Sequence, residues 1–217
     1  MASKIDAEKL YASLEIGKVP PGKIIGFTPL ELIHLYERFY QEFLEVENLF
    51  SEEFIPEMSG GYSFPVCVPN NSTESIIYAK MGEFFKYDSR LKLDNSASRR
   101  GYMKGDYIIA TSVASKSIES CEYVLRRNSQ FMTLLEAQIF WLFLQWLAGP
   151  NLWIADPNSI IVTSSRDFSG AFLVLDCQNR KIFGQNFSDF EINFGIYDQN
   201  GSPNPFRTRE IIYKYRS

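Results

Sequence analysis

Residues 134–148 restrict the fold of this chain more than any other segment, because they are apolar on nearly every side of the helix that they predict. They run LLEAQIFWLFLQWLA. Thr133 followed three residues later by Glu136 is a capping box, which starts a helix, and Gly149-Pro150 is a typical helix end. A helix that is apolar all round is buried, so the rest of the chain has to supply a thick shell around it.

Three surroundings fit such a helix: the centre of a core, a contact with a second protein, or a membrane. A membrane span needs about 20 apolar residues. Here the apolar run is shorter, and polar residues interrupt it (Glu136, Gln138, Gln145). We therefore expect a central core helix and no membrane insertion.

A second helix is predicted to start at Thr28, with Pro29 in its first turn and Glu31 completing another capping box. Apolar residues then follow a 3.6-residue period to about Phe50, as expected for a helix that packs on one face. The only histidine, His34, lies inside this helix. We expect it to be a structural residue and not a catalytic one.

The apolar period changes to two near Ser159, which is typical of half-buried strands. The predicted strands are 159–163, 170–176, 180–185, 190–196 and 208–215, with a turn at Asn200-Gly201 before the last. Short turns between consecutive strands indicate an antiparallel meander. Helices early (1–150) and strands late (151–217) predict an α+β fold, in which N-terminal and central helices pack on a largely antiparallel C-terminal sheet within a single globular domain, residues 1–217.

The remaining segments give weaker signals. We expect a helix over 6–16, capped by Asp6 and ended by Gly17, then a connector over 18–22, an edge strand at 64–68, a buried strand at 107–113 and a helix over 117–127. Residues 74–93 fit a helix and a strand equally well.

Charge and cysteine content limit the classes of partner. The net charge of −4 does not provide the basic surface that general nucleic-acid binding requires. The three cysteines are far apart and form no C-x-x-C pair, which predicts free buried thiols in a reducing compartment. The charged N-terminus lacks the apolar stretch of a signal peptide, so we expect a soluble cytoplasmic protein.

Motifs for catalysis and cofactor binding are missing from the sequence. It has no G-x-x-x-x-G-K-[ST] or G-x-G-x-x-G loop for phosphates and no G-x-S-x-G elbow. A single histidine excludes a two-histidine metal site within one chain. We therefore predict no cofactor, no metal and no catalytic residue, and leave open whether the protein is an enzyme.

The stretch DFSGAFLVLD, residues 167–176, resembles the acidic turn and strand found in some interaction and immunity domains. The likeness covers ten residues of 217, and the helices that those domains place around this segment are not evident in the sequence. It therefore names no family.

The densest positive charge lies in a glycine-containing loop before the predicted strand at 107–113, and its members are Arg99, Arg100, Tyr102 and Lys104. Arginine offers a planar set of donors to carboxylate or phosphate, and glycines let the backbone approach a ligand. Two interpretations remain: a binding site for an anion or an acidic partner, and a solvated loop that balances nearby acidic residues.

The aromatic content of 15% has two explanations, an aromatic-rich core and an exposed aromatic surface for a partner. Together with the missing catalytic motifs, it favours a non-enzymatic protein-binding module of adaptor, inhibitor or immunity-like type. The alternative is an enzyme or sensor for a small anionic ligand that uses carboxylate, tyrosine and arginine side chains without histidine or metal. The expected partner is thus another protein, or else a small anion.

Overall fold

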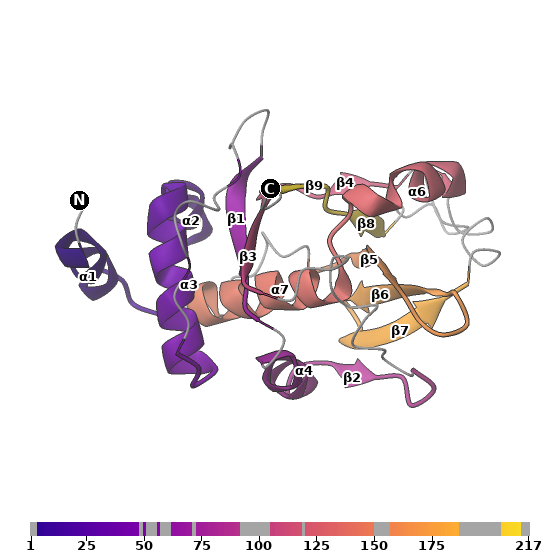
Figure 1. The fold of residues 1–217 in the computed structure, drawn as a ribbon, viewed down its shortest axis with the longest axis horizontal. Coiled ribbons are helices and arrows are strands. Elements are labelled where there is room, and N and C mark those ends of the chain that lie inside the picture. The colour runs from indigo at the N-terminus through magenta and orange to yellow at the C-terminus, as the bar shows by residue number, and fades with distance from the viewer. Residues whose placement is uncertain are drawn as a thin grey trace.

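In the computed structural model of the chain, α7 (Leu134–Ala148) runs through the middle of the molecule, with the N-terminal helices across one end and strands along the rest (Figure 1). Every residue of α7 except Gln145 is buried. Its capping box is formed: the Thr133 N–H donates to Glu136 Oε2 at 2.8 Å, and the Glu136 N–H donates to Thr133 Oγ1 at 3.2 Å. The predicted core helix is confirmed in its start, its end and its burial.

The structure describes residues 4–47, 50, 56, 62–70, 73–91, 105–118, 120–149, 157–186 and 205–213. The other helices are α1 (Lys4–Ala12), α2 (Pro21–Ile25), α3 (Pro29–Phe43), α4 (Glu74–Gly82), α6 (Cys121–Arg127) and a 3-10 turn, η3 (Asn128–Gln130). The strands are β1 (Tyr62–Val68), β2 (Lys86–Tyr87), β3 (Tyr107–Ser112), β4 (Lys116–Ser117), β5 (Ile160–Arg166), β6 (Phe172–Asp176), β7 (Lys181–Gln185), β8 (Phe206–Thr208) and β9 (Ile211–Tyr213). The fold is α+β, as predicted.

The described strands form two sheets. One is antiparallel with the order β1-β3-β9, and it confirms the buried strand at 107–113 and the edge position of 64–68. The other has the order β2-β7-β6-β5-β8-β4, and its β2–β7 and β5–β8 pairs are parallel. Strands from both halves of the chain enter each sheet.

The predicted C-terminal meander is therefore right only for β5, β6 and β7, which are consecutive and antiparallel. The predicted strand 208–215 is wrong as a single element: β8 ends at Thr208 in the larger sheet, and β9 begins at Ile211 in the smaller one. The predicted strand 190–196 and the turn at Asn200-Gly201 lie outside the described residues.

Arg209 and Glu210 lie between β8 and β9, and the Arg209 side chain helps to hold the two sheets together. It is 2% exposed, and its guanidinium lies 4.5 Å from the centre of the Phe140 ring on α7. Nη1 donates to the carbonyl oxygens of Ser112 and Val113 at 2.9 Å each. The Arg209 side chain thus connects the segment between β8 and β9 with the end of β3 and with α7.

The N-terminal helices differ from the prediction in their boundaries. α1 covers Lys4–Ala12 rather than 6–16, so Asp6 lies within the helix and is not its cap. Gly17 lies beyond the helix, where its N–H donates to Leu147 O at 2.9 Å, and so it docks the chain on α7 instead of ending α1. The predicted connector contains α2, with Pro21 in its first turn.

α3 begins as predicted, with both hydrogen bonds of the Thr28–Glu31 capping box present, but it ends at Phe43 and not near Phe50. The cause is a backbone reversal at Glu45, which has a φ of 57° in the left-handed region. The apolar period continues past this point in the sequence, and it gave no sign of the break.

Two further segments, 74–93 and 116–127, each begin or end with a short strand that the sequence did not separate from the helix. Residues 74–93 contain a helix followed by a strand, α4 and β2. The helix predicted over 117–127 starts only at Cys121, because Lys116 and Ser117 pair with β8 as β4. Leu125 on this helix is 54% exposed.

The described aromatic residues lie mainly in the core, around α3 and α7. Tyr36 of α3 stacks on Phe143 of α7 with ring centres 3.7 Å apart, and Phe39 meets the same ring edge-on at 5.7 Å. Cys67 and Cys177 are buried free thiols, as predicted; the Cys121 side chain lies outside the described part. No helix in the described part is long and apolar enough to cross a membrane.

Candidate functional site

The residues predicted to bind an anion, Arg99, Arg100, Tyr102 and Lys104, all lie outside the described residues. The anion-binding site expected at these residues therefore stays a prediction. His34 is described: it is partly buried on α3, with Nδ1 3.3 Å from Glu37 Oε2. A neighbour one turn along the same helix accounts for its contact, in keeping with the structural role expected of it.

The described surface has a cleft of about 460 Å3 at one end of the larger sheet, which we call the Phe168 cleft. Three segments form it: the turn after β2, the β5–β6 hairpin, and the C-terminal half of β7. Its described lining residues are Asp88, Arg90, Leu91, Asp167, Phe168, Ser169, Ala171, Gly184 and Asn186.

Asp167 gives the β5–β6 hairpin its shape. Its Oδ1 accepts hydrogen bonds from the Ser169 N–H at 2.8 Å, the Ser169 hydroxyl at 2.6 Å and the Ala171 N–H at 3.0 Å. Gly170 follows with a φ of 84°, a conformation that glycine adopts without strain. An aspartate side chain that accepts a hydrogen bond from the backbone N–H two residues later, followed by a glycine with a left-handed φ, makes a turn rigid.

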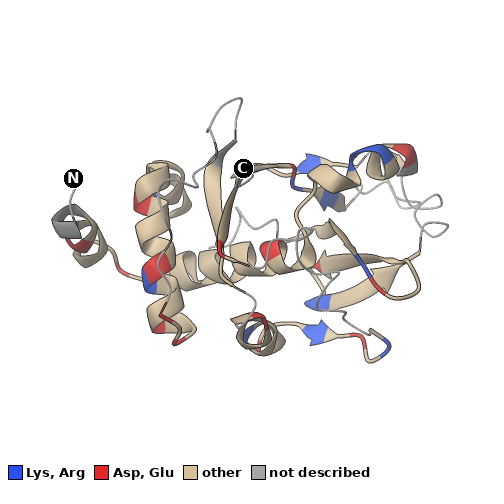
Figure 2. Ribbon diagram, viewed as in Figure 1, with Lys and Arg blue, Asp and Glu red and all other residues tan. Residues whose placement is uncertain are grey.

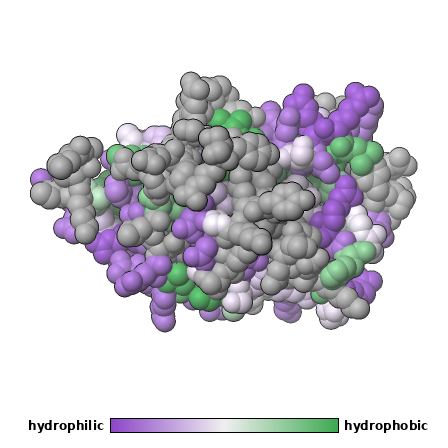
Figure 3. Space-filling view, in the orientation of Figure 1, coloured by the Kyte–Doolittle hydropathy of each residue, from purple (hydrophilic) through white to green (hydrophobic). Residues whose placement is uncertain are grey.

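This turn exposes Phe168, whose surface is 69% accessible. The hairpin is stiffened below it, because the Arg166 guanidinium lies 3.4 Å from the centre of the Phe172 ring and Nη1 donates to Gly170 O at 2.8 Å. Phe168 is the one aromatic residue in the described part whose side chain is mostly exposed rather than buried or half-buried. On the face drawn in Figure 3, the hydrophobic residues that are coloured form small, separate patches.

Gly184 on β7 forms the wall beside the hairpin. A Cβ atom there would lie 2.9 Å from Asp167 Oδ2 and 3.3 Å from Ala171 Cβ, so any side chain would displace the aspartate. The Oδ2 atom lies at this wall, while the three donors of the turn all bind Oδ1. One carboxylate oxygen thus holds the turn and the other faces the cleft.

Asp88 and Arg90 form the opposite wall. Asp88 accepts from the Arg90 N–H at 2.9 Å and Nε at 3.1 Å through Oδ1, and from Nη2 at 2.8 Å through Oδ2. The Arg90 hydrogen bonds lower the pKa of Asp88 to about 2, so its carboxylate stays ionised at neutral pH. A carboxylate of this kind recognises donors and does not deliver a proton.

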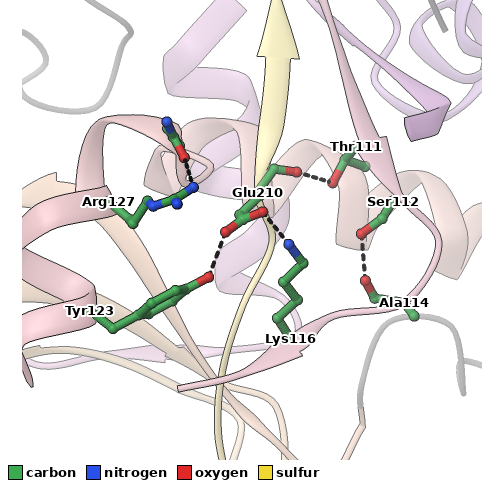
Figure 4. Close-up of polar contacts among 8 residues, drawn as sticks. Thr111, Ser112, Ala114, Lys116, Tyr123, Arg127 and Glu210 are labelled. Carbon is green, nitrogen blue, oxygen red and sulfur yellow. Dashed lines mark hydrogen bonds and ion pairs between the residues drawn. The ribbon is translucent and has the colours of Figure 1, made fainter. Parts of the chain in front are cut away.

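Glu210 forms a second polar constellation, in which a carboxylate, a tyrosine and a lysine converge (Figure 4). It is 5% exposed, and its carboxylate accepts from Lys116 Nζ and the Tyr123 hydroxyl. The Glu210 carbonyl accepts from Thr111 Oγ1 at 2.9 Å. Each of these groups bonds another within the cluster, which suits a structural contact that joins β3, β4 and α6 to the start of β9 better than a reactive centre.

No group of three or more His, Cys, Asp or Glu side chains placed to hold a metal ion is present where the structure describes the chain. The Phe168 cleft was missed by the sequence analysis, although DFSG between two strand-like segments is a turn signal and lies within the stretch that carried the likeness to interaction domains. Comparison with protein-family models, with curated proteins and with solved structures found no match to this chain.

Proposed function

We propose that the protein is a non-enzymatic binding module, of adaptor, inhibitor or immunity-like type, that contacts another protein through the Phe168 cleft. The observation that carries this proposal is the exposure of Phe168 on a turn made rigid by Asp167. Burying an exposed aromatic ring against a partner's apolar surface removes that ring from water, which favours association. Because the turn is already ordered, binding loses little conformational entropy there.

The charges of the cleft support recognition rather than catalysis. The alternative, an enzyme or sensor for a small anion, requires convergent polar groups whose pKa values suit proton transfer or ligand exchange. In the described part of the cleft the shifted groups are Asp88, whose pKa is lowered, and Arg90, whose pKa is raised by the same contact, so both shifts favour the charged forms and neither suits proton transfer at neutral pH. A rim of fixed charges around an aromatic anchor is the usual composition of a protein interface.

We place this interaction in the cytoplasm, with a protein partner rather than nucleic acid or a membrane. The net charge of −4 opposes general nucleic-acid binding. Cys67 and Cys177 are free thiols, which suits a reducing compartment.

The test compares wild type with Phe168→Ala as baits in lysate of the source cells, with captured proteins quantified by mass spectrometry. Ile76→Ala is the matched control, because Ile76 is also an exposed large apolar residue, on α4. A protein captured by wild type and by the control but not by Phe168→Ala is then purified for calorimetry. We expect Phe168→Ala to cost about 2 kcal/mol, a roughly thirtyfold weaker Kd, as at other aromatic anchors.

Thermal unfolding provides the folding check. Because Phe168 is 69% exposed, its replacement should leave the melting temperature of the protein nearly unchanged. The proposal is wrong if all three baits capture the same proteins in the same amounts.

A further inference from the structure

Two lysines face each other across the parallel β2–β7 pair, at the edge of the larger sheet. Lys86 and Lys181 are register partners, and both are exposed. Figure 2 shows basic residues on the adjoining ends of these two strands. Neighbouring strands lie about 4.8 Å apart, so the two lysines bring like charges to one place at the sheet edge.

These lysines line a second cleft, of about 410 Å3, which we call the lysine cleft. Its other lining residues are Tyr87, Asp88, Asp176, Ile182 and Phe183. Asp88 also lines the Phe168 cleft, so the two clefts adjoin at this residue.

The carboxylates bordering the lysine cleft already bind other donors. Asp88 is occupied by the Arg90 backbone and guanidinium. Asp176 is 5% exposed; its Oδ1 accepts from the Asn179 N–H and its Oδ2 from Asn179 Nδ2, at 2.9 Å each. Neither carboxylate lies within ion-pair distance of Lys86 or Lys181.

The two lysines therefore make no ion pair with any residue that the structure describes. The side chain of the neighbouring Arg180 does not enter the lysine cleft, so it neither adds positive charge there nor competes for an anion. Arg180, the residue before β7, has a φ of 53°. Its guanidinium lies 4.8 Å from the centre of the Trp141 ring, on the other side of the sheet. Lys181 interacts electrostatically with Asp88, but Arg90 already holds that carboxylate through three hydrogen bonds. A like-charge pair that forms no ion pair of its own within the described residues fits an anionic group that bridges both ammoniums.

We propose that the lysine cleft binds a carboxylate-bearing side chain of the partner protein, held between Lys86 and Lys181. This inference rests on the proposed function, and it adds the chemistry of the partner segment: an acidic side chain next to the apolar group that meets Phe168. Lysine serves this purpose as a point charge, so the contact weakens as salt screens it.

The test uses a fluorescein-labelled hexaglutamate peptide, followed by fluorescence anisotropy at low and high salt, with a labelled hexaserine peptide as the reference. We expect wild type to bind hexaglutamate and not hexaserine, and binding to fall as salt rises. Lys86→Ala with Lys181→Ala should bind about tenfold more weakly.

The matched control is Arg126→Ala with Arg127→Ala. These α6 residues are exposed, and their replacement changes the net charge by the same amount. The control should bind hexaglutamate as wild type does. Equal weakening in both double variants shows only an effect of net charge and overturns the proposal, as does a wild type that binds neither peptide. Displacement of the peptide by inorganic phosphate at concentrations where chloride has no effect identifies a free oxyanion as the ligand and also overturns it.

The lysine cleft and the Phe168 cleft can fail separately. Phe168→Ala should leave hexaglutamate binding unchanged, and Lys86→Ala with Lys181→Ala should weaken capture of the partner. If the partner is captured equally well without the two lysines, the inference is wrong while the proposed function stands. If Phe168 proves neutral but hexaglutamate binding and partner capture both depend on the lysines, the Phe168 contact is wrong and the lysine cleft stands.

Discussion

Gly149 and Gly17 are the residues where the end of the central helix meets the N-terminal segment. The N–H groups of Gly17 and Val19 both donate to Leu147 O, at 2.9 and 3.0 Å. Gly149 has a φ of 58°, and a Cβ atom on it would lie 2.3 Å from Gly17 O. The glycine that ends α7 therefore also leaves the space in which residues 17–19 dock.

We expect Gly149→Ala to lower the free energy of unfolding by about 3 kcal/mol, because the left-handed backbone and the collision with Gly17 O both oppose a side chain. Urea denaturation followed by circular dichroism measures this change. Gly22→Ala is the control: Gly22 lies in α2, and nothing is within 4 Å of its added Cβ. It should be neutral or stabilising by up to about 1 kcal/mol. A Gly149 variant as stable as this control would contradict the prediction.

At the scale of elements, the crossing of α3 and α7 is held by aromatic rings. Phe143 is 0% exposed and stacks on Tyr36 at 3.7 Å. It also meets Phe39 at 5.7 Å and Phe64 of β1 at 6.3 Å, in edge-to-face geometry. A single ring on α7 thus contacts both α3 and the smaller sheet.

Phe143→Ala should cost about 3–5 kcal/mol, because it removes a fully buried ring and leaves a cavity at this crossing. Leu125→Ala, at a 54% exposed site on α6, should change stability by less than about 0.5 kcal/mol. Chemical denaturation of the two variants beside wild type makes the comparison. Equal stability of all three would move α7 from the core to a surface or an interface.

At the scale of the whole molecule, α7 and the crossover at Arg209 connect the two sheets. The core around α7 includes side chains from the smaller sheet, such as Ile109, and from the larger sheet, such as Leu173. Arg209 bonds the end of β3 directly after β8. Neither sheet can lose its packing on α7 without exposing apolar residues that the other sheet also covers.

We therefore expect unfolding in one cooperative step, as the prediction of a single domain requires. Tryptophan fluorescence, to which the buried Trp141 and Trp146 contribute, reports the surroundings of α7, and far-ultraviolet circular dichroism reports all helices and strands. Their urea transitions should coincide within error. Separate midpoints would show that the sheets unfold independently and that the chain contains two units.

Local signals in the sequence determined the two main helices and the fold class. The capping boxes at Thr28 and Thr133 are hydrogen bonds among residues three apart, so a short stretch of sequence was enough to predict them. The burial of α7 agrees with its composition, because a helix with so few polar residues needs apolar surroundings on nearly every side. The apolar period of two correctly marked the strands β5, β6 and β7.

Only the tertiary structure decided which strands pair and where the clefts lie. Period-two patterning shows which face of a strand is buried but not its neighbour, so the parallel β2–β7 and β5–β8 pairs and the split between β8 and β9 could not be predicted. The Phe168 cleft brings together Asp88, Asp167 and Gly184 from three segments, and the lysine cleft depends on Lys86 lying opposite Lys181. Such contacts join residues far apart in the chain, so they can form and stabilise the protein only once the core around α7 has brought those residues together.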